Sequence, residues 1–581
     1  MILQSLVRYY DSLVKQGKIS EPGWNPVKVS YELELDKDGN LIRVIPLKIP
    51  ELRGKKQIMV PQELIVPAQN KRSSGVKANF LCDNASYILG CDNKGKKDRS
   101  LQCFNACKEL HDQILYAVNH PAAQAVLLYF EKWNPEKTMD CVCFKDYLED
   151  ALGNANFVFS YDGNQVHTIP EIKKAWRAYR TDNDEREKKT CLVTGELGAV
   201  ATLHPSIKGI RGAQSSGASL VSFNAPAFCS YGKEQGDNSP TSESAAFAYG
   251  AALNYLIADK KHVQYIGDTI VLSWSVTGKE IYQDFWFDSI FGENNFYEES
   301  DFLKMAKDIV QGKAVEINEE HICPDTEFYV LGIAPNAARL SVRFFYKNTF
   351  GTLISNILRH YERLDITTPS FVKKPKNSLW SLLQETVNNN SKEKNASPVL
   401  AGELLRSVLG DTLYPAGLLN GITLRVRADH IINYRRAAII KAYYLKNENK
   451  EVPKEVLTVS LNENSSNEAY NLGRLFAVLE MIQQKANPSI NSTIRDKYFN
   501  SASATPAHIF PTLIKLSQSH LKVIKRNNGE GAYTFYSKKI QEVTDLLPEE
   551  FSKRMSLPKQ GAFQLGYYHQ VQAFYTKKEE V

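Results

Sequence analysis

Apolar residues follow two different spacings along the first 190 residues of the chain. Segments 27–35 and 41–49 alternate apolar and polar residues and predict strands, because successive side chains of a strand face opposite ways. Segments 101–119 and 121–133 repeat apolar residues at helical spacing and predict helices. We therefore expect a domain of mixed helices and strands here.

The pattern changes near residue 191, where glycine and serine become frequent. Three runs rich in Val, Phe and Tyr predict strands at 269–275, 328–333 and 340–346. Between them, 242–257 predicts a helix with small residues on a tightly packed face.

Two polar stretches, 372–398 and 447–468, interrupt the remainder of the chain. The first has the composition of a linker or loop around one short helix. Apart from the second stretch, the sequence from about residue 400 repeats apolar residues at helical spacing, as in 472–482 and, less regularly, 513–524.

These patterns predict an α+β fold class, a multidomain mixed α/β body with a C-terminal α-helical bundle. A length of 581 residues favours roughly three or four domains, because one core cannot grow to that size. The expected parts are an N-terminal mixed domain with a basic loop (1–190), a central α+β domain (191–371), a polar linker (372–398) and a helical bundle (399–581).

Charge is distributed unevenly, although the formal net charge is only +6. Residues 471–581 hold 15 Lys and Arg against 9 Asp and Glu, and the rest of the chain is neutral. A basic module on a neutral body suggests a polyanionic partner, and a solvated lysine-rich helix surface is the alternative.

Nine cysteines, an odd number spread over a large chain, suggest a reduced, cytoplasmic compartment. The clustered Cys82, Cys91, Cys103 and Cys107 lack the paired spacing of structural zinc ligands, so buried free thiols are the better interpretation. The N-terminus lacks the apolar stretch of a signal peptide, and no apolar run is long enough for a membrane span.

Motifs that would indicate an enzyme are missing. The sequence has no phosphate-binding P-loop, no H-E-x-x-H and no G-x-S-x-G, and His111-Asp112 lacks the further ligands of a metal phosphohydrolase. We expect no cofactor, no metal and no catalytic residue. A metal-dependent nuclease and a purely architectural subunit remain as alternatives.

The segment from His204 to Pro240 is the strongest candidate for binding. It combines cations, short hydrogen-bonding side chains and glycines that allow the backbone to approach a ligand closely. Such loops suit a nucleic-acid groove or phosphate backbone, and a long structural loop is the alternative. The candidate residues are Lys208, Arg211, Gln214, Ser215, Ser216 and Asn224.

A second basic loop at 69–80 has similar chemistry and precedes an apolar stretch. A solvated turn explains it equally well in isolation. Its candidate residues are Lys71, Arg72, Ser73, Ser74, Lys77 and Asn79.

Basic residues also recur along the helical region. Lys515 and Lys522 are seven residues apart and so share a helix face, which Arg526 continues. Arg435 and Arg436 belong to an earlier cluster with one acidic residue among them. These rows would hold a nucleic-acid strand without reading its sequence, or they are ordinary solvent faces.

Long stretches of the sequence, in order, resemble a known family. Residues 190–236, 71–90, 330–345 and the C-terminal LGRLFAVLEMIQ, SASATPAHIFPTL and LGYYHQVQAFY are similar to the large subunit of the type I-C CRISPR surveillance complex, Cascade.

This resemblance implies a non-catalytic subunit that recognises the protospacer-adjacent motif in double-stranded DNA, helps to open the duplex and recruits a helicase–nuclease. Guide-RNA pairing would choose the remaining sequence. The implied partners are target DNA with its displaced strand, the crRNA and the backbone, handle-binding and small subunits. Residues from about 469 to 581 resemble that small subunit, which this family can also make from an internal start, here before Tyr470.

The resemblance also suggests roles for the candidate residues. The 204–240 segment would touch the motif or separate the strands, and the 69–80 loop would lie near the motif duplex or the guide-RNA end. The C-terminal rows would hold a strand.

Overall fold

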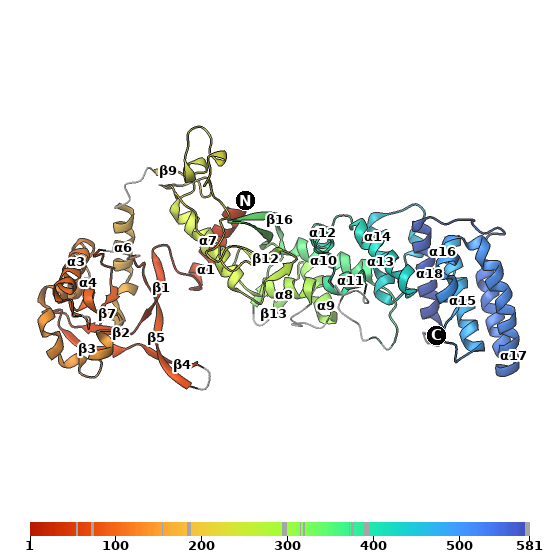
Figure 1. Ribbon diagram of the computed structural model, residues 1–581, viewed down its shortest axis with the longest axis horizontal. Coiled ribbons are helices and arrows are strands. Elements are labelled where there is room, and N and C mark those ends of the chain that lie inside the picture. The colour runs from red at the N-terminus through yellow and green to blue at the C-terminus, as the bar shows by residue number, and fades with distance from the viewer. Residues whose placement is uncertain are drawn as a thin grey trace. The chain divides into compact units, whose positions relative to one another are not determined.

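Two clusters of buried apolar residues organise the chain into two units in the computed structural model (Figure 1). The structure describes residues 1–53, 56–70, 75–93, 95–153, 155–182, 188–292, 299–313, 315–317, 320–370, 372, 377–388 and 395–575. The first unit comprises Met1–Pro205 and Val221–Leu253, and the second comprises Ser206–Leu220 and Asn254–Val581. The four-part division expected from the sequence is finer than these units and stays a prediction.

The first unit is built on a sheet of order β3-β2-β7-β6, in which β2 and β7 are parallel and β8 pairs with β7. A second sheet has the order β1-β5-β4, and β9 pairs with β10. The strands are β1 (Trp24–Val29), β2 (Tyr31–Leu35), β3 (Leu41–Pro46), β4 (Lys48–Arg53), β5 (Lys56–Pro67), β6 (Cys82–Asn84), β7 (Asn156–Tyr161), β8 (Asn164–Gln165), β9 (Lys188–Thr190) and β10 (Leu197–Ala199).

Helices α3 and α4 supply much of the core of this unit. In α4, Pro121 occupies the first turn and the ring of His120 accepts a hydrogen bond from the Ala122 N–H, which fixes the start of the helix. The helices are α1 (Ile2–Lys15), α2 (Ala85–Ile88), α3 (Lys97–Leu115), α4 (Pro121–Lys132), α5 (Leu148–Ala151) and α6 (Pro170–Asp182).

The second unit begins with an antiparallel sheet of order β11-β12-β15-β16. Helix α7 (Glu243–Ala258) leads into it, since its last turn, from Asn254, belongs to this unit. The strands are β11 (Gln264–Ile266), β12 (Thr269–Ser275), β13 (Val315–Ile317), β14 (Glu320–Ile322), β15 (Glu327–Asn336) and β16 (Arg339–Thr349). The helices that follow β12 are α8 (Ile281–Phe291), α9 (Glu299–Val310), α10 (Phe350–Leu364), α11 (Leu379–Gln384), α12 (Pro398–Gly410), α13 (Ala416–Asp429) and α14 (Tyr434–Asn447).

The C-terminal part of this unit is a helical bundle centred on α15 (Figure 1). Gly473 and Gly566 let α15 and α18 approach closely, since a Cβ at either position would lie 2.0 Å from a backbone oxygen of the other helix. The bundle helices are α15 (Glu468–Ala486), α16 (Ile494–Ala504), α17 (Pro506–Thr544) and α18 (Leu557–Tyr575).

The predicted fold class is confirmed: a mixed α/β N-terminal region precedes a largely helical C-terminal region. The predicted strand 27–35 is divided at Ser30, because β1 and β2 belong to different sheets. None of the helices among the described residues is long and apolar enough to cross a membrane.

Candidate nucleic-acid interface

Residues 206–220 form an exposed loop whose two ends are tied together and to the sheet, and we call it the 206–220 loop. Ile207 and Ala218 exchange both backbone hydrogen bonds at 2.9 Å, and Ile207 is fully buried. Ser219 donates to Ala338 and accepts from Leu340, both at 3.0 Å, in the β15–β16 hairpin. The base of the loop is therefore fixed to a regular element.

Two side chains from elsewhere in the second unit hold the first half of the loop. The Asn254 amide accepts a hydrogen bond from the Lys208 N–H at 2.9 Å and donates to the Ser206 carbonyl at 3.3 Å. The Tyr265 hydroxyl accepts from the Arg211 N–H at 3.3 Å and donates to the Gly209 carbonyl at 3.4 Å. These four bonds to the loop backbone use none of the candidate side chains.

The second half of the loop closes through Gly217, whose N–H donates to the Gln214 carbonyl at 2.9 Å. Gly217 has a φ of +100°, and a Cβ there would lie 2.9 Å from the Ile207 oxygen. Both features require glycine, because other residues rarely adopt this φ.

The exposed side chains of the 206–220 loop carry several kinds of hydrogen-bond donor. The Arg211 guanidinium lies over the Tyr265 ring, 4.6 Å from its centre, which limits the orientations of this cation. Cations, an amide and hydroxyls on a fixed backbone can contact both phosphates and base edges. The exposed candidates are Lys208, Arg211, Gln214, Ser215 and Ser216.

Not all of the predicted residues belong to this surface. Asn224 is exposed but belongs to the first unit, whereas the 206–220 loop belongs to the second. Lys71, Arg72, Ser73 and Ser74 lie outside the described residues, and Lys77 next to them is exposed.

Asn79 does not fit its expected role. Its side chain is 4% exposed, accepting from the Asn70 N–H at 2.8 Å and donating to Gln69 at 2.5 Å. These bonds close the base of the 69–80 loop, so the Asn79 side chain is not available to DNA or RNA.

Arg436 also departs from expectation. It is 5% exposed and donates to Glu385 at 3.0 Å and Asp429 at 2.9 Å, which ties α14 to α11 and α13. A buried arginine whose guanidinium is paired with two carboxylates is not available to hold a nucleic-acid strand. Its neighbour Arg435 is half-buried, and its guanidinium lies 5.0 Å from the centre of the Tyr434 ring.

The basic row on α17 is displayed as the spacing predicts. Lys515, Lys522 and Arg526 are all exposed, whereas Leu513, Leu521 and Ile524 on the same helix are buried. Three residues after Arg526, at Gly529, the backbone leaves the helical conformation (φ 86°, ψ 175°). This row can follow a phosphate backbone without reading bases.

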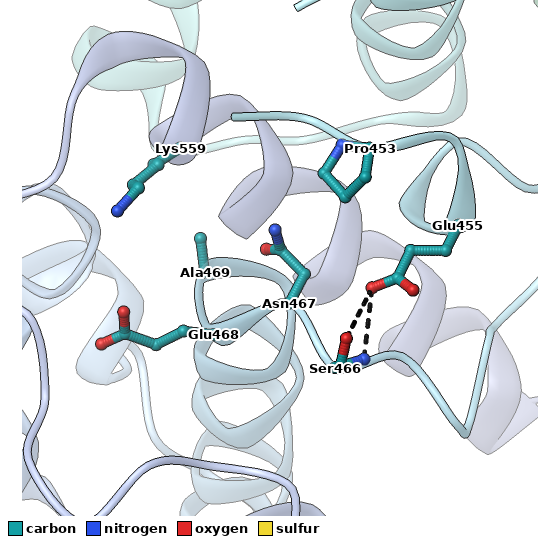
Figure 2. Close-up of a pocket in the computed structure, with 7 residues that line it drawn as sticks. All are labelled: Pro453, Glu455, Ser466, Asn467, Glu468, Ala469 and Lys559. Carbon is teal, nitrogen blue, oxygen red and sulfur yellow. Dashed lines mark hydrogen bonds between the residues drawn. The ribbon is translucent and has the colours of Figure 1, made fainter. Parts of the chain in front are cut away.

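A pocket of about 370 Å³ lies at the start of α15 (Figure 2). Most of its polar groups already have partners: Ser466 donates to Glu455, and Glu468 accepts from the Ser552 N–H and hydroxyl, each at 2.6 Å. The Asn467 side chain caps α15 by accepting from the Tyr470 N–H. These contacts join the helix to the preceding segment, so we assign the pocket a structural role.

The histidine of the His111-Asp112 pair is structural. His111 is buried, its Nε2 accepts from the Leu81 N–H at 3.0 Å, and its Nδ1 donates to the Cys107 carbonyl at 2.7 Å. Burial lowers the pKa of His111 to about 4, so the ring is neutral. Over the described residues, no group of three or more His, Cys, Asp or Glu could hold a metal ion.

The sequence did not reveal Asn254 and Tyr265, because each contacts the 206–220 loop from more than 40 residues away. Their helix and strand positions gave no signal of this contact.

Comparison with known proteins places the chain in a family. The family model described as CRISPR-associated protein (Cas_Csd1) matches residues 6–575. No curated protein matches the chain. The family match confirms the resemblance to the type I-C large subunit over nearly the whole sequence. The chain therefore belongs to the Cas_Csd1 family, the large subunits of the type I-C CRISPR surveillance complex.

Proposed function

We propose that this subunit reads the protospacer-adjacent motif in duplex DNA through the 206–220 loop and helps to separate the strands there. The observation that carries the proposal is the anchoring of that loop: its backbone is held by Asn254, Tyr265 and the β15–β16 hairpin. Five polar side chains remain exposed on this fixed backbone, and preorganised donors lose little entropy when they bind.

In this proposal, Gln214 and the neighbouring serines contact base edges, whereas Lys208 and Arg211 contact phosphates or guanine. Bidentate contacts to a base discriminate by about 1–3 kcal/mol each, so a few suffice for a short motif. Lys77 and Asn224 are secondary candidates, together with the undescribed residues at 71–74.

The exposed α17 row, with Arg435 as a weaker candidate, would hold the displaced or paired strand. The proposed partners are the crRNA, the backbone, handle-binding and small subunits, and the helicase–nuclease. The subunit itself would act without catalysing a reaction. Membership of the Cas_Csd1 family supports these assignments.

The decisive test uses the assembled complex with the double variant Lys208→Ala/Gln214→Ala. Affinity for duplex carrying the motif should fall at least about tenfold, with assembly intact, and discrimination against a mutated motif should shrink. The matched control is Lys304→Ala/Gln311→Ala, two exposed residues on and after α9. Unchanged motif discrimination in the Lys208/Gln214 variant would remove these residues from the role.

A nuclease is the competing function. Purified protein with Mg²⁺ or Mn²⁺ should leave linear and single-stranded DNA intact. Reproducible cleavage that disappears on changing one acidic cluster would favour the enzyme.

A further inference from the structure

A larger pocket, of about 650 Å³, lies within the first unit, and none of its lining residues belongs to the 206–220 loop or to α17. Its wall is formed by α6, the turn before β1, the β9–β10 hairpin and the start of α7. A volume of this size is typical of sites for small molecules or single monomer units of a polymer. We call it the α6–α7 pocket.

Cations dominate the charged groups of the α6–α7 pocket. Arg177, Arg180 and Lys188 line it, against Glu243 as an acidic residue. Arg177 pairs with Glu21. Among the described residues, the side chains of Arg180 and Lys188 form no hydrogen bond or ion pair. Two exposed cations with no such partner are therefore available to an anion.

The position of Arg180 is set by packing against the backbone. Its guanidinium occupies the space beside Gly23, where a Cβ would lie 1.9 Å from Nη1. One turn earlier on α6, the Trp176 indole N–H donates to the Gly23 carbonyl at 2.9 Å. Gly23 thus binds Trp176 in the wall of the pocket and leaves the space that the Arg180 guanidinium occupies.

Apolar side chains line the rest of the pocket. Leu197 and Leu203 are 75% and 76% exposed, and the half-buried Phe247 packs edge-to-face on Tyr10. Leaving large apolar side chains in water around a concave site is unfavourable and marks a binding surface.

A ligand that fits must carry both a flat apolar body and negative charge. A nucleotide has this chemistry: its base can lie between apolar side chains, as bases do when they leave a stack, while its phosphate meets Arg and Lys. We propose that the α6–α7 pocket binds one unpaired nucleotide, with Arg180 and Lys188 on the phosphate and Leu197, Leu203 and Phe247 around the base. This inference does not depend on motif reading by the 206–220 loop.

The nucleotide could be free or part of a single strand, and the experiment distinguishes the two. Isothermal titration of the full chain with each of AMP, CMP, GMP and UMP, and with a 5′-phosphorylated single-stranded RNA and DNA, should give saturable binding. Competition by a mononucleotide against the bound strand would assign the same pocket to both. Binding of strands alone would restrict the ligand to a polymer.

Variants then locate the binding. Arg180→Gln/Lys188→Gln should weaken it at least about tenfold, since charge-assisted hydrogen bonds to phosphate are lost. Leu203→Asn should weaken it while preserving the charges. Lys174→Gln, an exposed site on α6 that does not line the pocket, is the matched control. Unfolding midpoints of all variants verify that the fold is intact.

Three outcomes would overturn the proposal. The first is no saturable binding of any nucleotide or strand up to millimolar concentration. The second is binding that the Arg180/Lys188 variant leaves unchanged. The third is binding of an acidic, leucine-containing peptide in place of nucleotides, which would assign the pocket to a protein partner.

Discussion

The guanidinium of Arg211 is stacked on the ring of Tyr265, and the N–H of the same arginine donates to that tyrosine's hydroxyl. Tyr265 therefore holds both the backbone and the side chain of Arg211. Because such stacking contributes about 0.5–2 kcal/mol, Tyr265→Ala should weaken binding of the complex to motif-bearing duplex several-fold. Filter binding or gel shift measures this change.

Tyr116→Ala, at a tyrosine that is 84% exposed in the first unit and outside both candidate loops, is the control for loss of a tyrosine. Tyr265→Phe should fall between the wild type and Tyr265→Ala, because it keeps the ring and loses the hydroxyl. Equal affinity of Tyr265→Ala and the wild type would show that Arg211 needs no support from Tyr265.

The α17 row should determine part of the salt dependence of DNA binding. Each phosphate contact contributes about 0.7–0.9 to the slope of log K against log salt. Lys515→Ala/Lys522→Ala/Arg526→Ala should therefore reduce that slope by about 2–3, with motif discrimination unchanged. A slope equal to that of the wild type would mean that these residues are only a solvent face.

Arg436 should matter for stability rather than for binding. Arg436→Ala removes the buried cation that Glu385 and Asp429 share. This costs about 3 kcal/mol, at the lower end for a buried pair, because Asn433 still donates to Glu385 and Arg425 still pairs with Asp429. Urea unfolding measures the loss. The neighbouring Arg435→Ala should cost far less, and a similar loss for both variants would contradict the assigned difference.

The buried His262 should make stability depend on pH. Its ring nitrogens lie 2.5 Å from an Asp259 oxygen and 2.7 Å from an Asp284 oxygen, and Lys261 also pairs with Asp284. Burial favours the neutral ring, but the two carboxylates outweigh it and raise the pKa of His262. Burial likewise opposes ionisation of both aspartates, yet His262 and Lys261 lower their pKa values.

The sign of this dependence follows from the directions of the shifts. A raised histidine pKa gives stability that is complete below about pH 6.5 and is lost as pH rises through the folded value. The lowered aspartate pKa values give stability that is complete above about pH 4 and is lost on further acidification. The free energy of unfolding of His262→Gln should therefore be lower than that of the wild type, with the largest difference near pH 5 to 6 and a smaller one at pH 8. A gap that is constant with pH would refute the coupling.

We expect a small-subunit-like product that begins before residue 462 to be more stable than one that begins at residue 469. The buried Arg474 donates to the carbonyls of Asn462 and Glu463, at 3.4 and 3.0 Å, and Asn471 donates to that of Ser465. A fragment starting at residue 469 loses these acceptors, at a cost of about 1–3 kcal/mol relative to one starting at 460. Thermal unfolding followed by circular dichroism compares them, and equal midpoints would contradict the role of 462–467.

Helix and strand spacing in the sequence was sufficient to predict much of the fold. Helix α4 and strand β12 have nearly the predicted bounds, because Pro121 and the apolar run 269–275 act locally. The separation of β1 from β2 and the burial of Arg436 depend on contacts with distant elements, for which local spacing gives no signal. Composition was sufficient to predict which side chains of the 206–220 loop are candidates for binding. It gave no signal that Tyr265, 54 residues from Arg211, would hold the loop.

The part of α17 that precedes Gly529 also sets a length scale. Lys515 and Lys522 are seven residues apart, which is about 10 Å along a helix. Successive phosphates on one strand of a duplex advance by about 3.4 Å. A strand laid parallel to the helix would place Lys515 and Lys522 about three phosphates apart whatever its base sequence, and Arg526, four residues further, about 6 Å beyond Lys522.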